Sequence, residues 1–149
     1  DRRSVPVYGD GQQVRDWIYV DDHCRAVDAV MRRGATGEVY CIGARSERPN
    51  LDVVGTILDA VGAPRELITY VADRPGHDRR YAIDSSKVER ELGWAPRVTF
   101  EEGIAATVAW YRENGEWVER ARSGAYREFY ERNYGWRDAS VGTADTQNR

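Results

Sequence analysis

The sequence has few residues that could crosslink the chain through disulfides and no segment that could anchor it in a membrane. Its two cysteines, Cys24 and Cys41, are too few for a disulfide framework and lack the paired spacing of a zinc site. We therefore expect both thiols to be reduced and buried, in a cytoplasmic protein. No apolar run is long enough to span a membrane and no signal peptide opens the chain, so we expect no membrane partner.

Methionine and lysine are each present once, as Met31 and Lys87. The first residues, from Asp1 to Val5, include no initiator Met and are typical of a position inside a longer protein. The positive charge is almost all arginine, and the formal net charge of -3 argues against a general nucleic-acid surface. A chain of 149 residues with 41% hydrophobic and 32% charged residues is globular and long enough to bury a core.

Motifs for complete catalytic sites are also missing. No G-x-G-x-x-G occurs, because Val14 stands where the third glycine after Gly9 and Gly11 should be. No Tyr-x-x-x-Lys occurs either, since Ile83 is four residues before Lys87. G-x-S-x-G, H-E-x-x-H and C-x-x-C are absent too. On its own the chain is predicted to bind a ligand and not to transform it.

What is present is a pattern of short strands interleaved with helices, so the predicted fold class is α/β. Apolar alternation and turn residues predict the strands, and helical spacing with terminal signals predicts the helices. Asp21 and Asp22 are expected to cap a helix that ends near Gly34, and Thr99 to Glu102 has the form of a capping box. The predicted strands are Val5–Tyr8, Gln13–Val20 and Glu38–Ile42, and the predicted helices begin near Asp21, Asn50, Ser85 and Thr99.

The most informative stretch runs from Asp73 to Asp84. Pro75 and Gly76 predict a turn that gathers Arg74 with His77, Arg79 and Arg80. Arginine can hold a phosphate with two parallel hydrogen bonds, so the stretch is a candidate diphosphate site. The alternative is a solvated loop in which the arginines pair with neighbouring carboxylates such as Asp78 and Asp84, and such pairs stabilise little.

Several stretches together resemble a known family. In order they are Arg15 to His23, Asn50 to Val54, Ile68 to Asp84, Glu91 to Trp94 and Ser123 to Tyr126. The chain, from about Val5 to about Tyr134, resembles the C-terminal half of the dTDP-glucose 4,6-dehydratases, which are extended short-chain dehydrogenases/reductases. The first of these stretches is shared by many extended members, whereas Asp73 to Asp84 is the more specific one.

The resemblance assigns roles to particular residues. Arg15 and Arg74 match arginines that contact the substrate's diphosphate, and Asn50 matches an asparagine that binds the nucleotide. The position of Asn50 is also that of a helix N-cap. Tyr8 matches a residue beside the base, although an aromatic at such a strand position is more often a packing residue. The substrate-binding residues implied are Pro6, Val7, Tyr8, Arg15, Asn50, Asp73, Arg74, Pro75, Gly76 and His77.

The resemblance also implies what the rest of the protein does. Members of that family are lyases of deoxysugar biosynthesis. They convert dTDP-glucose to dTDP-4-keto-6-deoxyglucose, and NAD+ stays bound and is recycled during the reaction. The N-terminal Rossmann half binds NAD and carries the catalytic residues, so this chain is expected to hold no catalytic residue, cofactor-binding residue or metal ligand. The full-length enzyme is expected to be a homodimer. Residues 1–137 are expected to be the nucleotide-sugar-binding region, and residues 138–149 a disordered polar tail.

Two alternatives stay open on the sequence alone. The first is the C-terminal half of a related epimerase or decarboxylase that acts on a UDP-sugar. The second is a non-catalytic interaction domain that docks a partner through aromatic residues near its C-terminus.

Overall fold

The computed structural model describes residues 3–124, 128 and 132. The chain divides into two compact units, residues 1–108 and residues 109–149. The site residues predicted from the sequence all fall in the first unit. The expected tail at residues 138–149 lies outside the described residues, as do the aromatic residues Tyr126, Phe129 and Tyr130.

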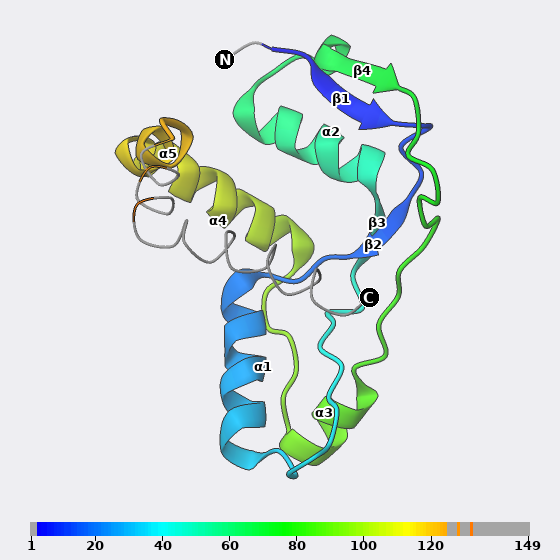
Figure 1. Cartoon of the computed structure of the whole chain (residues 1–149), viewed down its shortest axis with the longest axis vertical. Helices are drawn as coiled ribbons and strands as arrows, with labels where there is room; N and C mark the ends of the chain where they lie inside the picture. Colours follow the sequence, from blue (N-terminus) through cyan, green and yellow to red (C-terminus); the bar gives the residue numbers. More distant parts are fainter. Residues whose placement is uncertain (1–2, 125–127, 129–131, 133–149) are drawn as a thin grey trace, which may run out of the picture. The chain divides into compact units, whose positions relative to one another are not determined.

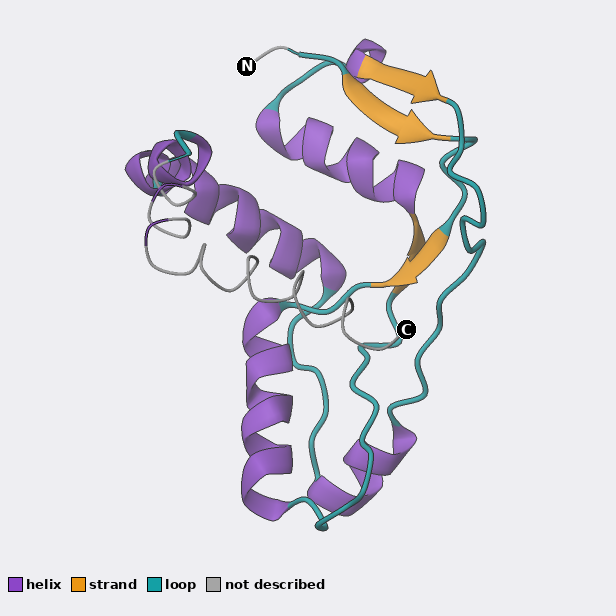
Figure 2. Ribbon diagram, viewed as in Figure 1, coloured by secondary structure: helices purple, strands orange, loops and turns teal. Residues whose placement is uncertain are grey.

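The described strands of the first unit form two small pairs (Figures 1 and 2). Strand β1 (Val5–Tyr8) runs parallel to β4 (Ile68–Val71), with Tyr8 opposite Val71. Strand β2 (Val14–Asp16) runs antiparallel to β3 (Glu47–Pro49), with Arg15 opposite Arg48. Because β1 ends at Tyr8 and β2 begins at Val14, one short segment links the two pairs.

The first unit contains α1 (Val20–Arg33), α2 (Asn50–Val61), the 3₁₀ turn η1 (Arg65–Leu67) and α3 (Ser86–Leu92). Helix α4 (Phe100–Glu113) begins in this unit and continues into the second, where α5 (Gly115–Arg122) follows. The core lies where α1 packs on α3 and is made of Ala26, Val88, Leu92 and Trp94. The predicted α/β class is confirmed.

Local helix signals were predicted well. The capping box forms as expected, because Thr99 Oγ1 accepts from the Glu102 N–H at 3.3 Å and Glu102 Oε2 accepts from the Thr99 N–H at 2.9 Å. Helix α3 ends at Gly93, whose φ of +62° suits glycine. Helix α2 begins at Asn50 as predicted. Helical spacing puts Leu51, Val54, Ile57, Leu58 and Val61 on one apolar face; Leu58 is buried as this predicts, but so is Val53, whereas Ile57 and Val61 are exposed.

The strand predictions were less accurate. Residues Glu38–Ile42 form no strand, because no described segment pairs with their backbone. Tyr40 and Ile42 instead pack against the core through their side chains. The strand predicted over Gln13–Val20 is confined to Val14–Asp16, the length that β3 can pair with.

Two further predictions were wrong. Neither Asp21 nor Asp22 caps α1, whose N-cap is Tyr19 with no side-chain hydrogen bond. Asp22 is buried and its Oδ2 accepts from the backbone N–H groups of Arg97 and Val98, at 2.8 and 2.9 Å, so it fastens α1 to the segment before α4. The cysteines are free, as expected, but both Cys24 and Cys41 are exposed and not buried.

Membrane spans and metal clusters were not found in the described part of the chain. None of its helices combines the length and apolar character needed to cross a membrane. No group of three or more histidine, cysteine or acidic side chains among the described residues is placed to hold a metal ion.

Candidate functional site

The turn predicted at Pro75 and Gly76 is present. The His77 N–H donates to the Arg74 carbonyl at 3.2 Å, and Gly76 has a φ of +68°. Proline followed by glycine at the two central positions is the usual sequence for a turn of this geometry. The turn holds Arg74 and His77 at its two ends.

The loop that follows the turn is fastened to β2. The Val14 N–H donates to the Arg79 carbonyl at 2.8 Å, and the Tyr81 N–H donates to the Val14 carbonyl at 3.0 Å. This short parallel bridge is centred on Val14 and Arg80. Arg15, on β2, is therefore brought next to a loop more than 60 residues away in the sequence.

The arginines of this region differ in their partners. Arg79 donates to both carboxylate oxygens of Asp10, at 2.8 and 2.9 Å, and Arg80 forms a two-bond pair with Glu47, at 2.6 and 2.8 Å. The partners expected from the sequence, Asp78 and Asp84, are not the ones used. Among the described residues, Arg15 and Arg74 have no carboxylate partner. Their charge therefore stays available to an anion.

The Arg15 guanidinium is held by neutral groups. It donates to the carbonyls of Val14 and Asp78, at 2.7 and 3.1 Å, and lies over the Tyr81 ring with Cζ 4.4 Å from the centroid. The Tyr81 hydroxyl in turn donates to Asp78, and this contact raises the pKa of Tyr81. The charges of Arg15 and Arg74 act in the opposite direction on the pKa of the same hydroxyl.

The Tyr8 ring is contacted by both Arg74 and His77. The Arg74 guanidinium lies over its ring, with Cζ 5.6 Å from the centroid. The His77 ring meets Tyr8 edge-on at 6.5 Å, and its Nδ1 lies 2.6 Å from Asp73 Oδ1. The Tyr8 ring is itself about half exposed, so it keeps surface for a planar ligand such as a base.

Tyr8, Arg74 and His77 line one cavity of about 400 Å³. Of the ten residues predicted from the sequence, six lie in its wall: Pro6, Val7, Tyr8, Asn50, Arg74 and His77. The other four do not line it: Arg15 contacts the loop beside Tyr81, Asp73 binds its neighbours, and Pro75 and Gly76 form the turn. The structure thus gathers segments from β1, α2 and the loop after β4, and the role of each residue in ligand binding stays a prediction.

Asn50 is placed differently from the N-cap that its position in the sequence allowed. The N-cap of α2 is Pro49, and Asn50 is the first helical residue. Its backbone N–H donates to the Gln13 carbonyl at 2.9 Å. No side-chain cap bond forms at this helix, and Asn50 lies in the wall of the cavity.

Sequence reasoning missed four residues of the cavity wall: Trp17, Val53, Val54 and Ile57. Helical spacing indicated a packed face of α2 that includes Val54 and Ile57 but not Val53, and spacing alone cannot distinguish packing on protein from packing on a ligand. The exposure of Ile57 follows from this position in the wall.

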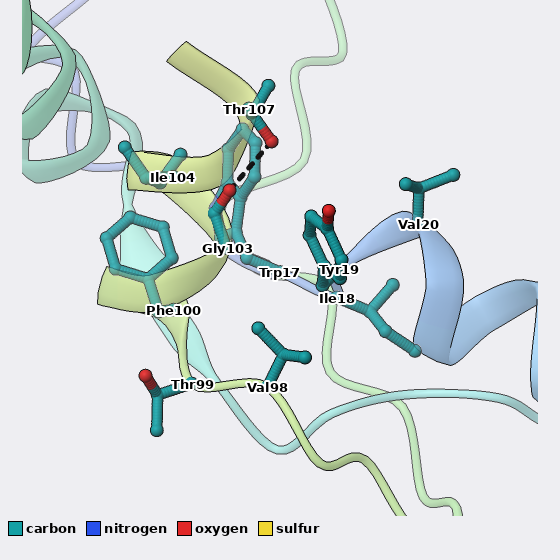
Figure 3. Close-up of a pocket in the computed structure, with 10 residues that line it drawn as sticks. All are labelled: Trp17, Ile18, Tyr19, Val20, Val98, Thr99, Phe100, Gly103, Ile104 and Thr107. Carbon is teal, nitrogen blue, oxygen red and sulfur yellow. Dashed lines mark hydrogen bonds between the residues drawn. The ribbon is translucent and has the colours of Figure 1, made fainter. Parts of the chain in front are cut away.

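A second cavity of about 210 Å³ shares Trp17 with the first (Figure 3). Its walls are mostly apolar and come from residues 17–20 and from the start of α4, including Phe100 and Ile104. Its two threonine hydroxyls are already used, since Thr107 donates to the Gly103 carbonyl at 2.7 Å and Thr99 donates to Glu102 at 2.8 Å. The first cavity, with a cation, an imidazole and an amide, is therefore the candidate for a polar ligand.

The turn between β1 and β2 does not form the glycine cradle of a dinucleotide cofactor. Gly9 and Gly11 lie in a turn between β1 and β2, whereas a dinucleotide cradle needs glycines that lead from a strand into a helix N-terminus. The cation, the imidazole and the half-exposed Tyr8 ring are suited to an anion with an aromatic group attached.

Comparison with known proteins identifies relatives of this chain. The family model described as GDP-mannose 4,6 dehydratase matches residues 1–107. The dTDP-glucose 4,6-dehydratase of Escherichia coli is 54% identical over 139 residues, which are 89% of this chain and 38% of that protein. The enzyme of the same name from Xanthomonas campestris pv. campestris (strain B100) is 54% identical over 132 residues, 83% of this chain. The chain thus spans about 38% of the length of these relatives.

Solved structures show the same likeness. The dTDP-glucose 4,6-dehydratase of Streptomyces venezuelae, solved with NAD and dTDP bound, is 49% identical with a TM-score of 0.74. The match covers 77% of this chain and 36% of that one. A UDP-glucose 4-epimerase of Thermotoga maritima, solved with UDP-glucose, is 34% identical with a TM-score of 0.71 over 75% of this chain and 36% of that one.

Proposed function

Since this chain belongs to the GDP-mannose 4,6-dehydratase family, we propose that it is the nucleotide-diphosphate-binding part of a dTDP-glucose 4,6-dehydratase. The observation that carries the proposal is a pair of guanidiniums, Arg15 and Arg74, with no carboxylate partner among the described residues. Arg74 lies in the wall of the cavity beside the Tyr8 ring, and Arg15 lies outside that wall, against Tyr81. Two arginines around a diphosphate would neutralise its charge and fix its orientation.

Each part of the ligand has a partner in this proposal. Arg15 and Arg74 bind the diphosphate, Tyr8 lies against the base, and the Asn50 amide hydrogen-bonds the nucleotide. His77 lines the same wall and contacts the substrate. In this assignment Pro6 and Val7 shape the base end of the cavity, and Pro75 and Gly76 set the direction of Arg74.

The complete protein is proposed to convert dTDP-glucose to dTDP-4-keto-6-deoxyglucose, as the names of its relatives indicate. A Rossmann half outside this sequence would bind NAD, which oxidises and re-reduces the sugar within one turnover. We propose that the complete enzyme is a homodimer. We also propose that it is cytoplasmic, where two exposed free cysteines stay reduced.

The test is a calorimetric titration of the chain with dTDP. Arg15→Ala and Arg74→Ala are each expected to weaken binding by about 1–3 kcal/mol, the range for a hydrogen bond to a charged group. Arg79→Ala is the matched control, because it removes the same charge from the same loop but from a guanidinium already paired with Asp10. Equal losses in all three variants would show that only the net charge matters and would contradict the proposed site.

A specific observation supports a second candidate, because the neighbour from Thermotoga maritima was solved with UDP-glucose. Titration with UDP in parallel separates the two: tighter binding of UDP than of dTDP would favour an epimerase-like or decarboxylase-like protein. Binding of neither nucleotide would leave the interaction domain as the remaining alternative.

A further inference from the structure

The carboxylate of Asp73 is already occupied by three protein groups. Its Oδ1 accepts from the Arg74 N–H at 2.8 Å and lies 2.6 Å from His77 Nδ1, while its Oδ2 accepts from Gln13 Nε2 at 3.0 Å. The hydrogen bond from His77, followed by that from the Arg74 N–H, holds the pKa of Asp73 below its usual value. A carboxylate with this many donors is poorly suited to bind an anionic ligand directly.

The backbone around Asp73 makes room for this arrangement. A Cβ on Gly9 would lie only 2.7 Å from Asp73 Oδ2, so a larger residue there would displace the carboxylate. Gly9 itself is fixed by donating its N–H to the Val71 carbonyl at 3.0 Å. The segments that contain Gly9 and Asp73 therefore lie close together in a fixed arrangement.

The groups held by Asp73 are those that face the candidate ligand. The Arg74 backbone is fixed at one end of the turn and the His77 ring at the other. The His77 side chain is 6% exposed and packs edge-on against Tyr8, over which the Arg74 guanidinium also lies. A shift of Asp73 would therefore move Arg74 and the His77 imidazole together. Through its contact with His77 it would also disturb the Tyr8 ring.

Gln13 supplies the remaining support. This residue is 3% exposed, and its Oε1 is buried without a hydrogen-bond partner among the described residues. Burying an unpartnered amide oxygen is unfavourable, so the position is not explained by packing alone. A neutral donor is required at this place, because a carboxylate there would lie about 3 Å from that of Asp73 and repel it.

We propose that Gln13 and Asp73 are positioning residues that hold Arg74 and His77 in the geometry that binds the diphosphate, and that Asp73 is not itself a ligand contact. This inference rests on the proposed function, since it concerns the same cavity. Nothing in the sequence pattern singled out Gln13, because its partner is 60 residues away.

The experiment exchanges the donor and acceptor between the two residues. Gln13→Glu is expected to weaken dTDP binding at least tenfold by setting two carboxylates against each other. Asp73→Asn is expected to change binding less than threefold, since Gln13 can turn its amide over and accept with the free Oε1. In the double variant, the carboxylate introduced at position 13 accepts from the amide introduced at position 73, so binding is expected to return to within threefold of the wild-type chain.

A second comparison separates positioning from a general loss of structure. If Gln13 acts through Arg74, then Gln13→Glu in an Arg74→Ala background costs little more than Arg74→Ala alone. Additive losses, or no recovery in the double variant, would overturn the inference. Should Gln13→Glu fail to fold, Gln13→Met removes the donor at similar volume, and unchanged dTDP binding by it would overturn the inference.

The two hypotheses fail in different ways. If the wild-type chain does not bind dTDP, both the proposed function and this inference are wrong. If it binds dTDP and Arg74→Ala weakens the binding, but the Gln13 and Asp73 variants behave additively, only the positioning role is wrong.

Discussion

At the scale of single residues, guanidiniums close together in this chain have different tasks. Arg79 and Arg80 are exposed and each is paired with a carboxylate on another segment, so they fasten the loop after the turn to the segment before β2 and to β3. Arg15 and Arg74 contact carbonyls or aromatic rings, which leave their charge uncompensated. The alternative from the sequence, a loop of self-paired charges, therefore describes neither pair, because the partners of Arg79 and Arg80 lie outside the loop.

The sequence identified most of the candidate site because the motif positions were specific. Tyr8, Asn50, Arg74 and His77 were predicted as site residues and lie in one cavity wall. The partners that hold such groups in place were not predictable. Gln13 meets Asp73, and Arg80 meets Glu47, only after folding, and no local pattern links residues so far apart.

Asp22 allows a test of stability against pH. Burial would raise its pKa, but the bonds from Arg25 and from the N–H groups of Val98 and Arg97 outweigh burial and hold the pKa below its usual value. A pKa that is lower in the folded chain than in the unfolded one contributes stability above about pH 4, and this is lost as the pH falls through the folded value.

We expect Asp22→Asn to lower the free energy of unfolding by about 2 kcal/mol at pH 7, since one charged acceptor is lost. The difference from the wild-type chain should shrink between about pH 5 and about pH 2, the range over which such a carboxyl is protonated. Urea unfolding at a series of pH values measures it, with exposed Asp21→Asn as the control. A difference that stays constant with pH would contradict this role of Asp22.

At the scale of elements, several helix ends were predictable, whereas only one strand, Val5–Tyr8, has the predicted bounds. The capping box at Thr99 and the end of α3 at Gly93 depend on residues within a few positions of each other. A strand instead depends on a partner elsewhere, and β4 pairs with β1 although the two are far apart in the sequence. The segment Glu38–Ile42 has a suitable composition but no described partner, so composition alone led to the wrong prediction.

The capping box predicts the effect of a change at Thr99. Thr99→Ala removes the acceptor of the Glu102 N–H and the hydroxyl that binds the Glu102 carboxylate. We expect it to lower the free energy of unfolding by about 1 kcal/mol, the usual value for such a cap. Thr99→Ser keeps the hydroxyl and should stay close to wild type in the same urea titration. If the serine variant loses as much as the alanine variant, packing of the Thr99 methyl and not capping stabilises the start of α4.

At the scale of the whole molecule, the proposed function is nucleotide binding, and the sequence predicts no catalysis by this chain alone. It spans about 38% of its curated relatives and contains neither a Tyr-x-x-x-Lys pair nor a dinucleotide cradle. We therefore expect no 4-keto-6-deoxy sugar when the chain is incubated with dTDP-glucose and NAD+. Chromatography of the sugar nucleotides measures this, and turnover by the chain alone would contradict it.

The most direct measurement compares the affinity of the chain for dTDP with that for thymidine, by calorimetry, in the wild-type, Arg15→Ala, Arg74→Ala and Arg79→Ala forms. We predict that dTDP binds more tightly than thymidine, and that this difference falls in the Arg15 and Arg74 variants while it persists in the Arg79 variant. A diphosphate contribution that is absent in the wild-type chain, or that survives the loss of both Arg15 and Arg74, would contradict the proposed site.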